Sequence, residues 1–155
     1  METLPWVATI DKFQHWVYEH PPGLPSTHTH AERRAAWVRT YEQFADSVTD
    51  WTGLEHYKEY IWQKQLHLYE VPFYYIEYGI AQLGAIGVWR NYRRDAKAGL
   101  QGYKDALKLG YQAPIQAIYA AANVPFDFSK EHIGELMAFL QQEINQLKAG
   151  PASIG

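Results

Sequence analysis

The run from Val71 to Asp95, VPFYYIEYGIAQLGAIGVWRNYRRD, constrains the fold of this chain more than any other part of the sequence. Pro72 suits the first turn of a helix, and the run continues to about Arg94, so we predict one long helix over residues 72–94. Small residues are frequent within it, although each glycine costs about 1 kcal/mol relative to alanine in a helix. They are Gly79, Ala81, Gly84, Ala85 and Gly87. Because small side chains let another backbone come close, we expect this helix to be deeply packed.

The rest of the chain also has the apolar spacing of helices, and no strand-like alternation or internal repeat occurs. Three helix starts are predicted by capping residues: Thr29, which has Glu32 three positions later, Asp95 and Ser129. The further helices are predicted over residues 4–19, 29–48, 54–67, 95–109, 114–122 and 129–147. The fold class is therefore all-α, with several helices forming one domain over residues 1–148 and a frayed tail over 149–155.

Length and charge exclude several classes of function. The chain has 155 residues, the size of one domain, and a formal net charge of −3, so no sequence-wide basic surface indicates nucleic acid or an anionic membrane as a partner. The absence of cysteine excludes disulfides and thiolate metal sites, and it fits a reducing compartment such as the cytoplasm. No secretory signal begins the sequence. The least polar run, Pro72 to Trp89, is interrupted by Glu77 and Gln82, so we interpret it as a buried helix and not as a membrane span.

The seven histidines prompt a search for a metal site. Neither H-E-x-x-H nor H-x-x-E-H occurs, although both are typical of zinc peptidases. His15, Glu19 and His20 come near the second pattern, but one extra residue turns the two imidazoles off a common helix face. We interpret these two histidines, with the nearby His28 and His30, as solvated side chains of a helix end and a loop. No metal ligand is therefore predicted in this chain.

A cluster of possible hydrogen-bond donors remains between His67 and Tyr78, in the run HLYEVPFYYIEY. On a helix that starts near Pro72, Tyr75 and Tyr78 are three apart and Tyr74 and Tyr78 four apart, so each pair shares a face. A tyrosine hydroxyl has a pKa near 10 and is a neutral donor at pH 7. Two hydroxyls and an imidazole aimed at one point could stabilise a developing oxyanion. The spacing alone favours the alternative, an aromatic core stripe whose hydroxyls bond to the backbone.

Several runs, in one order along nearly the whole chain, resemble the oligoendopeptidase F group of the wider thimet oligopeptidase family. The strongest is PFYYIEYGIAQLGA, from Pro72 to Ala85. The others are LPWVATIDKFQHWVY, ERRAAW, WTGLE, WQKQLHLYEVPF, YKDALKLG and VPFDFS. Several separate motifs in the right order make a chance match improbable, so the chain is similar to the C-terminal part of the catalytic region of such a zinc metallo-oligopeptidase.

The resemblance implies a mostly helical, clam-like body around a deep channel that admits short peptides as substrates. It implies one zinc, held by an H-E-x-x-H helix and a downstream glutamate, in segments upstream of the equivalent of Met1. We therefore expect zinc in the complete enzyme, none bound by this chain alone, and an upstream catalytic segment as its partner. His67 matches the family's conserved histidine, Tyr75 and Tyr78 match its tyrosine pair best, and Tyr74 matches less well. These four are the expected catalytic and substrate-binding residues.

Two hypotheses about function follow. In the first, the chain is a piece of a peptidase that is active only with its upstream part, so the isolated chain should not hydrolyse peptides. In the second, it is a stand-alone, non-catalytic helical module that binds peptides or associates with itself through exposed apolar faces.

Overall fold

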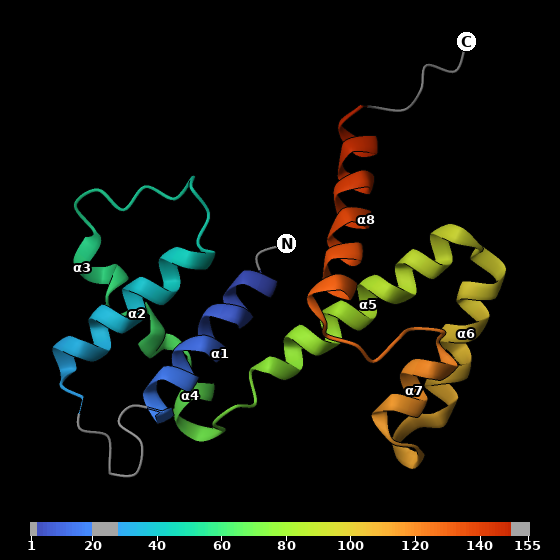
Figure 1. The fold of residues 1–155 in the computed structure, drawn as a ribbon, viewed down its shortest axis with the longest axis horizontal. Helices are drawn as coiled ribbons and strands as arrows, with labels where there is room; N and C mark the ends of the chain where they lie inside the picture. The colour runs from blue at the N-terminus through green and yellow to red at the C-terminus, as the bar shows by residue number, and fades with distance from the viewer. Residues whose placement is uncertain (1–2, 20–27, 150–155) are drawn as a thin grey trace. The chain divides into compact units, whose positions relative to one another are not determined.

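The computed structural model describes residues 3–19 and 28–149. These two ranges consist of helices, turns and loops and contain no strand (Figure 1). The predicted all-α class is confirmed there. The chain divides into two compact units, Met1–Ile80 and Ala81–Gly155, which are described in turn. The predicted tail begins at Ala149, the C-cap of the last helix, and its residues 150–155 lie outside the described ranges, as does His20. No helix of the described residues is long and apolar enough to cross a membrane.

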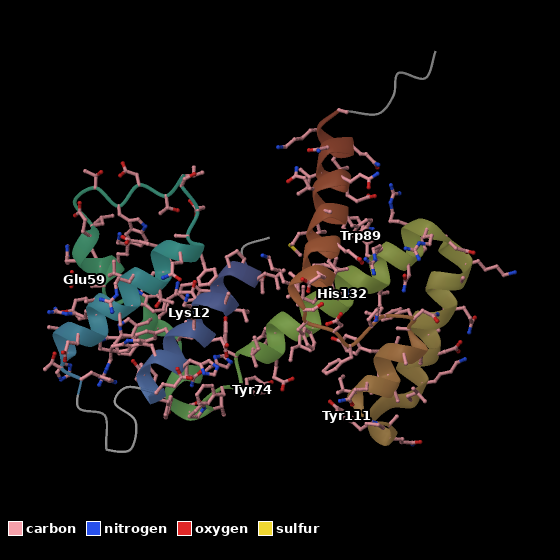
Figure 2. All side chains as sticks on the ribbon, in the orientation of Figure 1. Lys12, Glu59, Tyr74, Trp89, Tyr111 and His132 are labelled. Atoms are coloured by element: carbon pink, nitrogen blue, oxygen red, sulfur yellow. The ribbon has the colours of Figure 1, made fainter. Side chains whose placement is uncertain are left out.

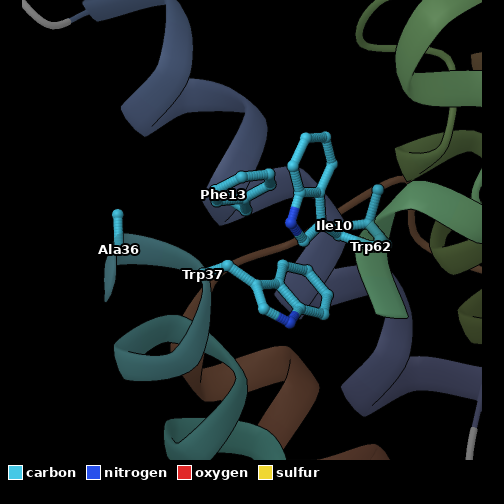
Figure 3. Packing of buried hydrophobic residues seen from close by; sticks show 5 residues of the cluster. All are labelled: Ile10, Phe13, Ala36, Trp37 and Trp62. Atoms are coloured by element: carbon cyan, nitrogen blue, oxygen red, sulfur yellow. The ribbon is translucent and has the colours of Figure 1, made fainter. Parts of the chain in front are cut away.

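In the first unit, α1 (Thr3–Glu19) and α2 (His30–Phe44) enclose an aromatic core (Figure 3). The Phe13 ring lies edge-on to Trp37 at 5.2 Å and tilted against Trp62 at 5.4 Å between centroids. Ile10 and Ala36 complete this buried cluster. The predicted capping box is present: the Thr29 hydroxyl accepts from the Glu32 amide, and the Glu32 carboxylate accepts from the Thr29 amide.

The end of α2 is earlier than predicted. The helix ends at Phe44, four residues before the expected end at Val48. The carboxylate of Asp46 accepts hydrogen bonds from the backbone amides of Val48 and Thr49, at 2.8 and 2.7 Å. These bonds form a local turn that competes with the helix for the same backbone.

The single helix predicted over residues 54–67 is wrong. Three short pieces replace it: α3 (Glu55–Lys58), η1 (Ile61–Lys64) and α4 (His67–Glu70). Two buried indoles explain the break, since the Trp37 N–H donates to the Lys58 carbonyl at 2.9 Å and the Trp62 N–H to the Glu59 carbonyl at 3.1 Å. Both carbonyls would otherwise accept from the next turn of a continuous helix.

The long central helix starts later than predicted. α5 spans Ile76–Arg94, and residues 72–75 form a turn in front of it, with Phe73 in the left-handed region at φ 61°. A side chain rarely adopts that backbone conformation, which ends any helical pattern that begins at Pro72. Residues 76–80 of α5 belong to the first unit and residues 81–94 to the second.

The second unit continues with α6 (Ala96–Leu109), η2 (Gly110–Gln112), α7 (Ile115–Ala121) and α8 (Lys130–Lys148). The predicted caps are confirmed: Asp95 accepts from the amides of Lys97 and Ala98, and Ser129 accepts from the amide of His132. Ala106, Ala122 and Val124 form a buried cluster in this unit.

The close approach predicted for the small residues of α5 is confirmed for its glycines, and in the first unit a Cβ added at Gly79 would lie 3.0 Å from Cγ1 of Val7. An added Cβ at Gly84 would lie 2.5 Å from the Tyr119 hydroxyl, and one at Gly87 would lie 2.7 Å from Cγ1 of Val124. Ala81 and Ala85 are not packed in this way, because both are exposed. Gly84 and Gly87 thus serve specific contacts with the chain around α7.

Replacing Gly87 by alanine should destabilise the chain. The new methyl group meets the stiff, 5% exposed side chain of Val124. Overpacking costs about 1–3 kcal/mol, against a gain of about 1 kcal/mol in helix propensity, so we expect a net loss of about 1 kcal/mol. Urea denaturation followed by circular dichroism measures it. Gly134→Ala in α8 is the matched control, since the added Cβ would meet nothing within 4 Å. This substitution should stabilise the chain. Equal stabilisation by both changes would contradict this account of packing.

Candidate functional site

The structure brings His67, Tyr74, Tyr75 and Tyr78 together within the first unit. The His67 ring lies 6.0 Å from Tyr74, 5.1 Å from Tyr75 and 5.6 Å from Tyr78 between centroids, stacked on the first and edge-on to the others. The Tyr75 and Tyr78 rings are 5.0 Å apart, and Tyr74 and Tyr78 are 5.8 Å apart. All four predicted site residues therefore form one cluster, which we call the His–Tyr cluster.

A shared helix face does not produce this cluster, contrary to the reasoning from spacing. Tyr74 and Tyr75 precede α5, whose first residue is Ile76, and only Tyr78 lies in its first turn. Tyr74 marks the position of this connection in Figure 2.

The turn at Phe73 places the two tyrosines instead. Its left-handed backbone costs on the order of 1–3 kcal/mol and requires compensation from its surroundings. The Phe73 ring packs against His15 at 5.0 Å and Tyr18 at 5.2 Å between centroids, both on α1. These contacts hold the turn, and the turn directs Tyr74 and Tyr75 toward His67.

A row of hydrogen bonds connects the cluster to α1. The Trp6 indole N–H donates to Oε1 of Gln65 at 3.1 Å. The Gln65 amide nitrogen lies 2.7 Å from Nδ1 of His67, and Nε2 of His67 lies 3.1 Å from the hydroxyl of Tyr78. Because each ring nitrogen of His67 has a polar partner, the orientation of the imidazole is fixed in its plane.

The cluster is partly open to solvent. Tyr74 and Tyr78 are 46% and 42% exposed, while His67 and Tyr75 are half-buried. Tyr75 packs against the aromatic core, and burial raises the pKa of its hydroxyl, an effect that the neighbouring polar N–H of the Trp6 indole partly offsets. The interpretation as a sealed core stripe therefore fits Tyr75 in part and does not fit Tyr74 and Tyr78.

The other histidines of the N-terminal region do not form a metal site among the residues that the structure describes. In residues 3–19 and 28–149, no group of three His, Asp or Glu side chains is placed so that it could hold a metal ion. His15 is near Asp11 and Glu19 on the exposed side of α1. The prediction that His28 is a solvated side chain is wrong. Its ring stacks on Trp16 at 4.9 Å between centroids, and its Nδ1 faces the Arg33 guanidinium.

Comparison with known proteins places the chain among the peptidases. It belongs to peptidase family M3, whose family model matches residues 2–137. An X-ray structure assigned as an oligoendopeptidase F is similar, with a TM-score of 0.68 and 28% sequence identity over 92% of this chain and 24% of that chain. The chain thus spans about a quarter of the length of that structure. No curated protein sequence matches it. The resemblance inferred from the sequence motifs is confirmed.

Reasoning from the sequence missed two residues of the site, Gln65 and Trp6. An isolated glutamine carries no motif of its own, and its partner is 59 positions away in the sequence. The only signal for them was that both lie inside runs that resemble the family, WQKQLHLYEVPF and LPWVATIDKFQHWVY.

The raised pKa of Tyr75 predicts a loss of stability at alkaline pH. Above about pH 10 the unfolded chain ionises this hydroxyl before the folded chain does, so the free energy of unfolding should fall as pH rises from there. Tyr69 contributes in the same direction, because burial also raises its pKa. Tyr75→Phe should make the decline between about pH 9 and about pH 11 shallower, as measured by urea denaturation. The control Tyr111→Phe, at a fully exposed position, should leave the slope unchanged. An unchanged slope in Tyr75→Phe would contradict the role of burial.

Proposed function

We propose that this chain is part of a zinc metalloendopeptidase that hydrolyses short peptides, similar to oligoendopeptidase F, and that it supplies hydrogen-bond donors to the substrate and the transition state. His67, Tyr75 and Tyr78 are the proposed catalytic residues, and Tyr74 adds a substrate-binding ring. The observation that carries the proposal is the hydrogen bond between Nε2 of His67 and the exposed hydroxyl of Tyr78 at 3.1 Å, in a chain of peptidase family M3.

The chemistry depends on the direction of that hydrogen bond. When Nε2–H of His67 donates to the Tyr78 oxygen, the hydroxyl proton of Tyr78 is available for another acceptor. A peptide carbonyl, and still more the oxyanion that develops from it, is such an acceptor. The incoming bond also polarises the phenol, which strengthens it as a donor. A donor of this kind contributes roughly 3 kcal/mol to transition-state stabilisation.

Tyr75 and Tyr74 complete the proposed arrangement. The half-buried Tyr75 is fixed by the core, so its hydroxyl can act as a second, less mobile donor. The exposed Tyr74 ring, stacked on His67 with an interplanar angle of 10°, offers an apolar face to the peptide.

The zinc ligands and the general base are proposed to lie on an upstream part of the catalytic domain. The described residues do not fit a zinc site, since no three potential ligands meet among them. An H-E-x-x-H motif in the coding sequence that precedes Met1 would support this division of the site. A cytoplasmic location is part of the proposal and is based on the absence of cysteine.

A second candidate, the stand-alone helical module, is favoured by an apolar stripe on α6. Its members, exposed by 44–108%, are Leu100, Tyr103, Leu107 and Tyr111, the last in η2. Such stripes mark surfaces that another molecule covers. Light scattering during size-exclusion chromatography separates the candidates: a monomer or a defined oligomer with a cooperative melt favours the module, and aggregation through apolar surface favours a lobe of a larger enzyme.

The purified chain should not hydrolyse peptides, with or without added zinc. The reason is that the proposed donors have no activated water to work with when the upstream segment is absent. A quenched fluorescent peptide incubated with the chain and zinc measures turnover. Hydrolysis that a chelator abolishes would refute the proposed division of the site.

In the complete enzyme, Tyr78→Phe should lower kcat by about 10²–10³-fold with little change in KM, the loss typical of one oxyanion donor. The phenyl ring preserves the packing against Tyr75, so the loss isolates the hydroxyl. Steady-state kinetics on a peptide substrate measures both constants, with Tyr111→Phe as the control at a position remote in sequence and fully exposed. A loss confined to KM would assign Tyr78 to substrate binding alone.

A further inference from the structure

The side chain of Gln65 sits between two groups that together decide which way its amide points. An indole N–H can only donate, so the Gln65 atom 3.1 Å from Trp6 must be the carbonyl oxygen. The NH₂ group of the amide then faces Nδ1 of His67 at 2.7 Å. The opposite orientation would place the amide N–H against the indole N–H of Trp6, and two donors cannot form a hydrogen bond. The indole therefore fixes the orientation of the amide.

The orientation of the amide in turn decides the tautomer of His67. A ring nitrogen that accepts from an amide carries no proton, so the proton of the neutral imidazole is on Nε2. From there it donates to the Tyr78 hydroxyl at 3.1 Å. An oriented histidine more often donates from Nδ1 to a carboxylate or carbonyl group. Here the neighbour of Nδ1 is a donor, so Nδ1 accepts a hydrogen bond instead of donating one.

The tautomer matters because it determines what Tyr78 can do. If the proton were on Nδ1, Nε2 would be an acceptor, and the Tyr78 hydroxyl would donate to it. Its single proton would then be unavailable to a substrate. With the proton on Nε2, the same hydroxyl accepts from His67 and keeps its proton for an external oxygen.

We propose that Gln65, itself oriented by Trp6, is a positioning residue that holds His67 in the Nε2–H tautomer and thereby directs the Tyr78 hydroxyl proton outward. The link to catalysis rests on the function proposed above, whereas the tautomer itself does not. Three separate stretches of the chain supply the row: Trp6 lies on α1, Gln65 and His67 lie where η1 ends and α4 begins, and Tyr78 lies on α5.

Nuclear magnetic resonance on the full chain tests the proposal without any peptide. With ¹⁵N-labelled histidine, at a pH well above about 6.5 where a free imidazole is neutral, long-range ¹H–¹⁵N spectra distinguish protonated from unprotonated ring nitrogens. The His67 signals are identified by their loss in His67→Gln. The wild-type chain should show protonated Nε2 and unprotonated Nδ1. Protonated Nδ1 would overturn the proposal at once, whatever the variants do.

Gln65→Glu is the informative variant. A carboxylate only accepts, so it should draw the proton to Nδ1 and exchange the two nitrogen signals. Gln63→Glu is the matched control, since Gln63 is exposed in η1 and the same charge is introduced two residues away. Its spectrum should keep the wild-type pattern. Wild-type signals in a folded Gln65→Glu chain would overturn the proposal.

Trp6→Phe tests the first member of the row. The phenyl ring keeps an aromatic contact in the core but removes the N–H, so the amide loses the group that orients it. His67 should then show a mixture of tautomers, intermediate between the wild type and Gln65→Glu. A pure Nε2–H pattern in this variant would limit the positioning role to Gln65 and overturn the part assigned to Trp6.

The catalytic consequence is measured separately, in the complete enzyme. Gln65→Glu should lower kcat about as much as Tyr78→Phe, and the double variant should lose little more than either single variant, because both changes remove one donor. Additive losses, together with the expected tautomer change, would overturn the catalytic role while the tautomer assignment stands. If the wild-type chain shows no preference for the Nε2–H tautomer while Tyr78→Phe still lowers kcat, the proposed function stands and this inference is overturned.

Discussion

The buried indole of Trp37 is the group on which the rest of the first unit depends. Its ring is fully buried, edge-on to Phe13 at 5.2 Å and to Trp6 at 5.8 Å between centroids. Its N–H needs a partner in the apolar core and finds one in the Lys58 carbonyl. One side chain therefore joins α1 and α2. It also determines where the segment between α2 and α5 departs from a continuous helix.

That departure makes the candidate site possible. A continuous helix over residues 54–67 would carry His67 at its end and lead straight into the following turn. In the structure, the carbonyls of Lys58 and Glu59 are bound by Trp37 and Trp62, so the chain folds into short pieces that lie against the core. Gln65 thereby reaches the indole of Trp6, and the Trp6 ring is held by Trp37. The hydrogen-bond row that ends at Tyr78 is thus anchored in the same aromatic core.

The sequence predicted the helix caps, which depend on neighbouring residues, and it missed both the local turn at Asp46 and the features that depend on distant partners. The caps at Thr29, Asp95 and Ser129 are visible because cap and helix are neighbours along the chain. The break after Lys58 is not visible, since it depends in part on the indole of Trp37, which lies on α2. The His–Tyr cluster is an instructive intermediate case. Its members were correctly grouped, but helix spacing was the wrong reason, because the turn at Phe73 and not a helix face assembles them.

Phe73 shows how stability and function are connected here. A phenylalanine at φ 61° is unfavourable for the backbone, and a glycine would adopt that conformation without strain. Glycine would, however, remove the ring that packs on His15 and Tyr18 and ties the turn to α1. A relaxed but untethered turn would let Tyr74 and Tyr75 move away from His67. Donors stabilise a transition state only when their positions are fixed before the reaction begins. The strain at Phe73 is therefore the cost of fixing the tyrosines, and it is offset by ring contacts on the exposed side of α1.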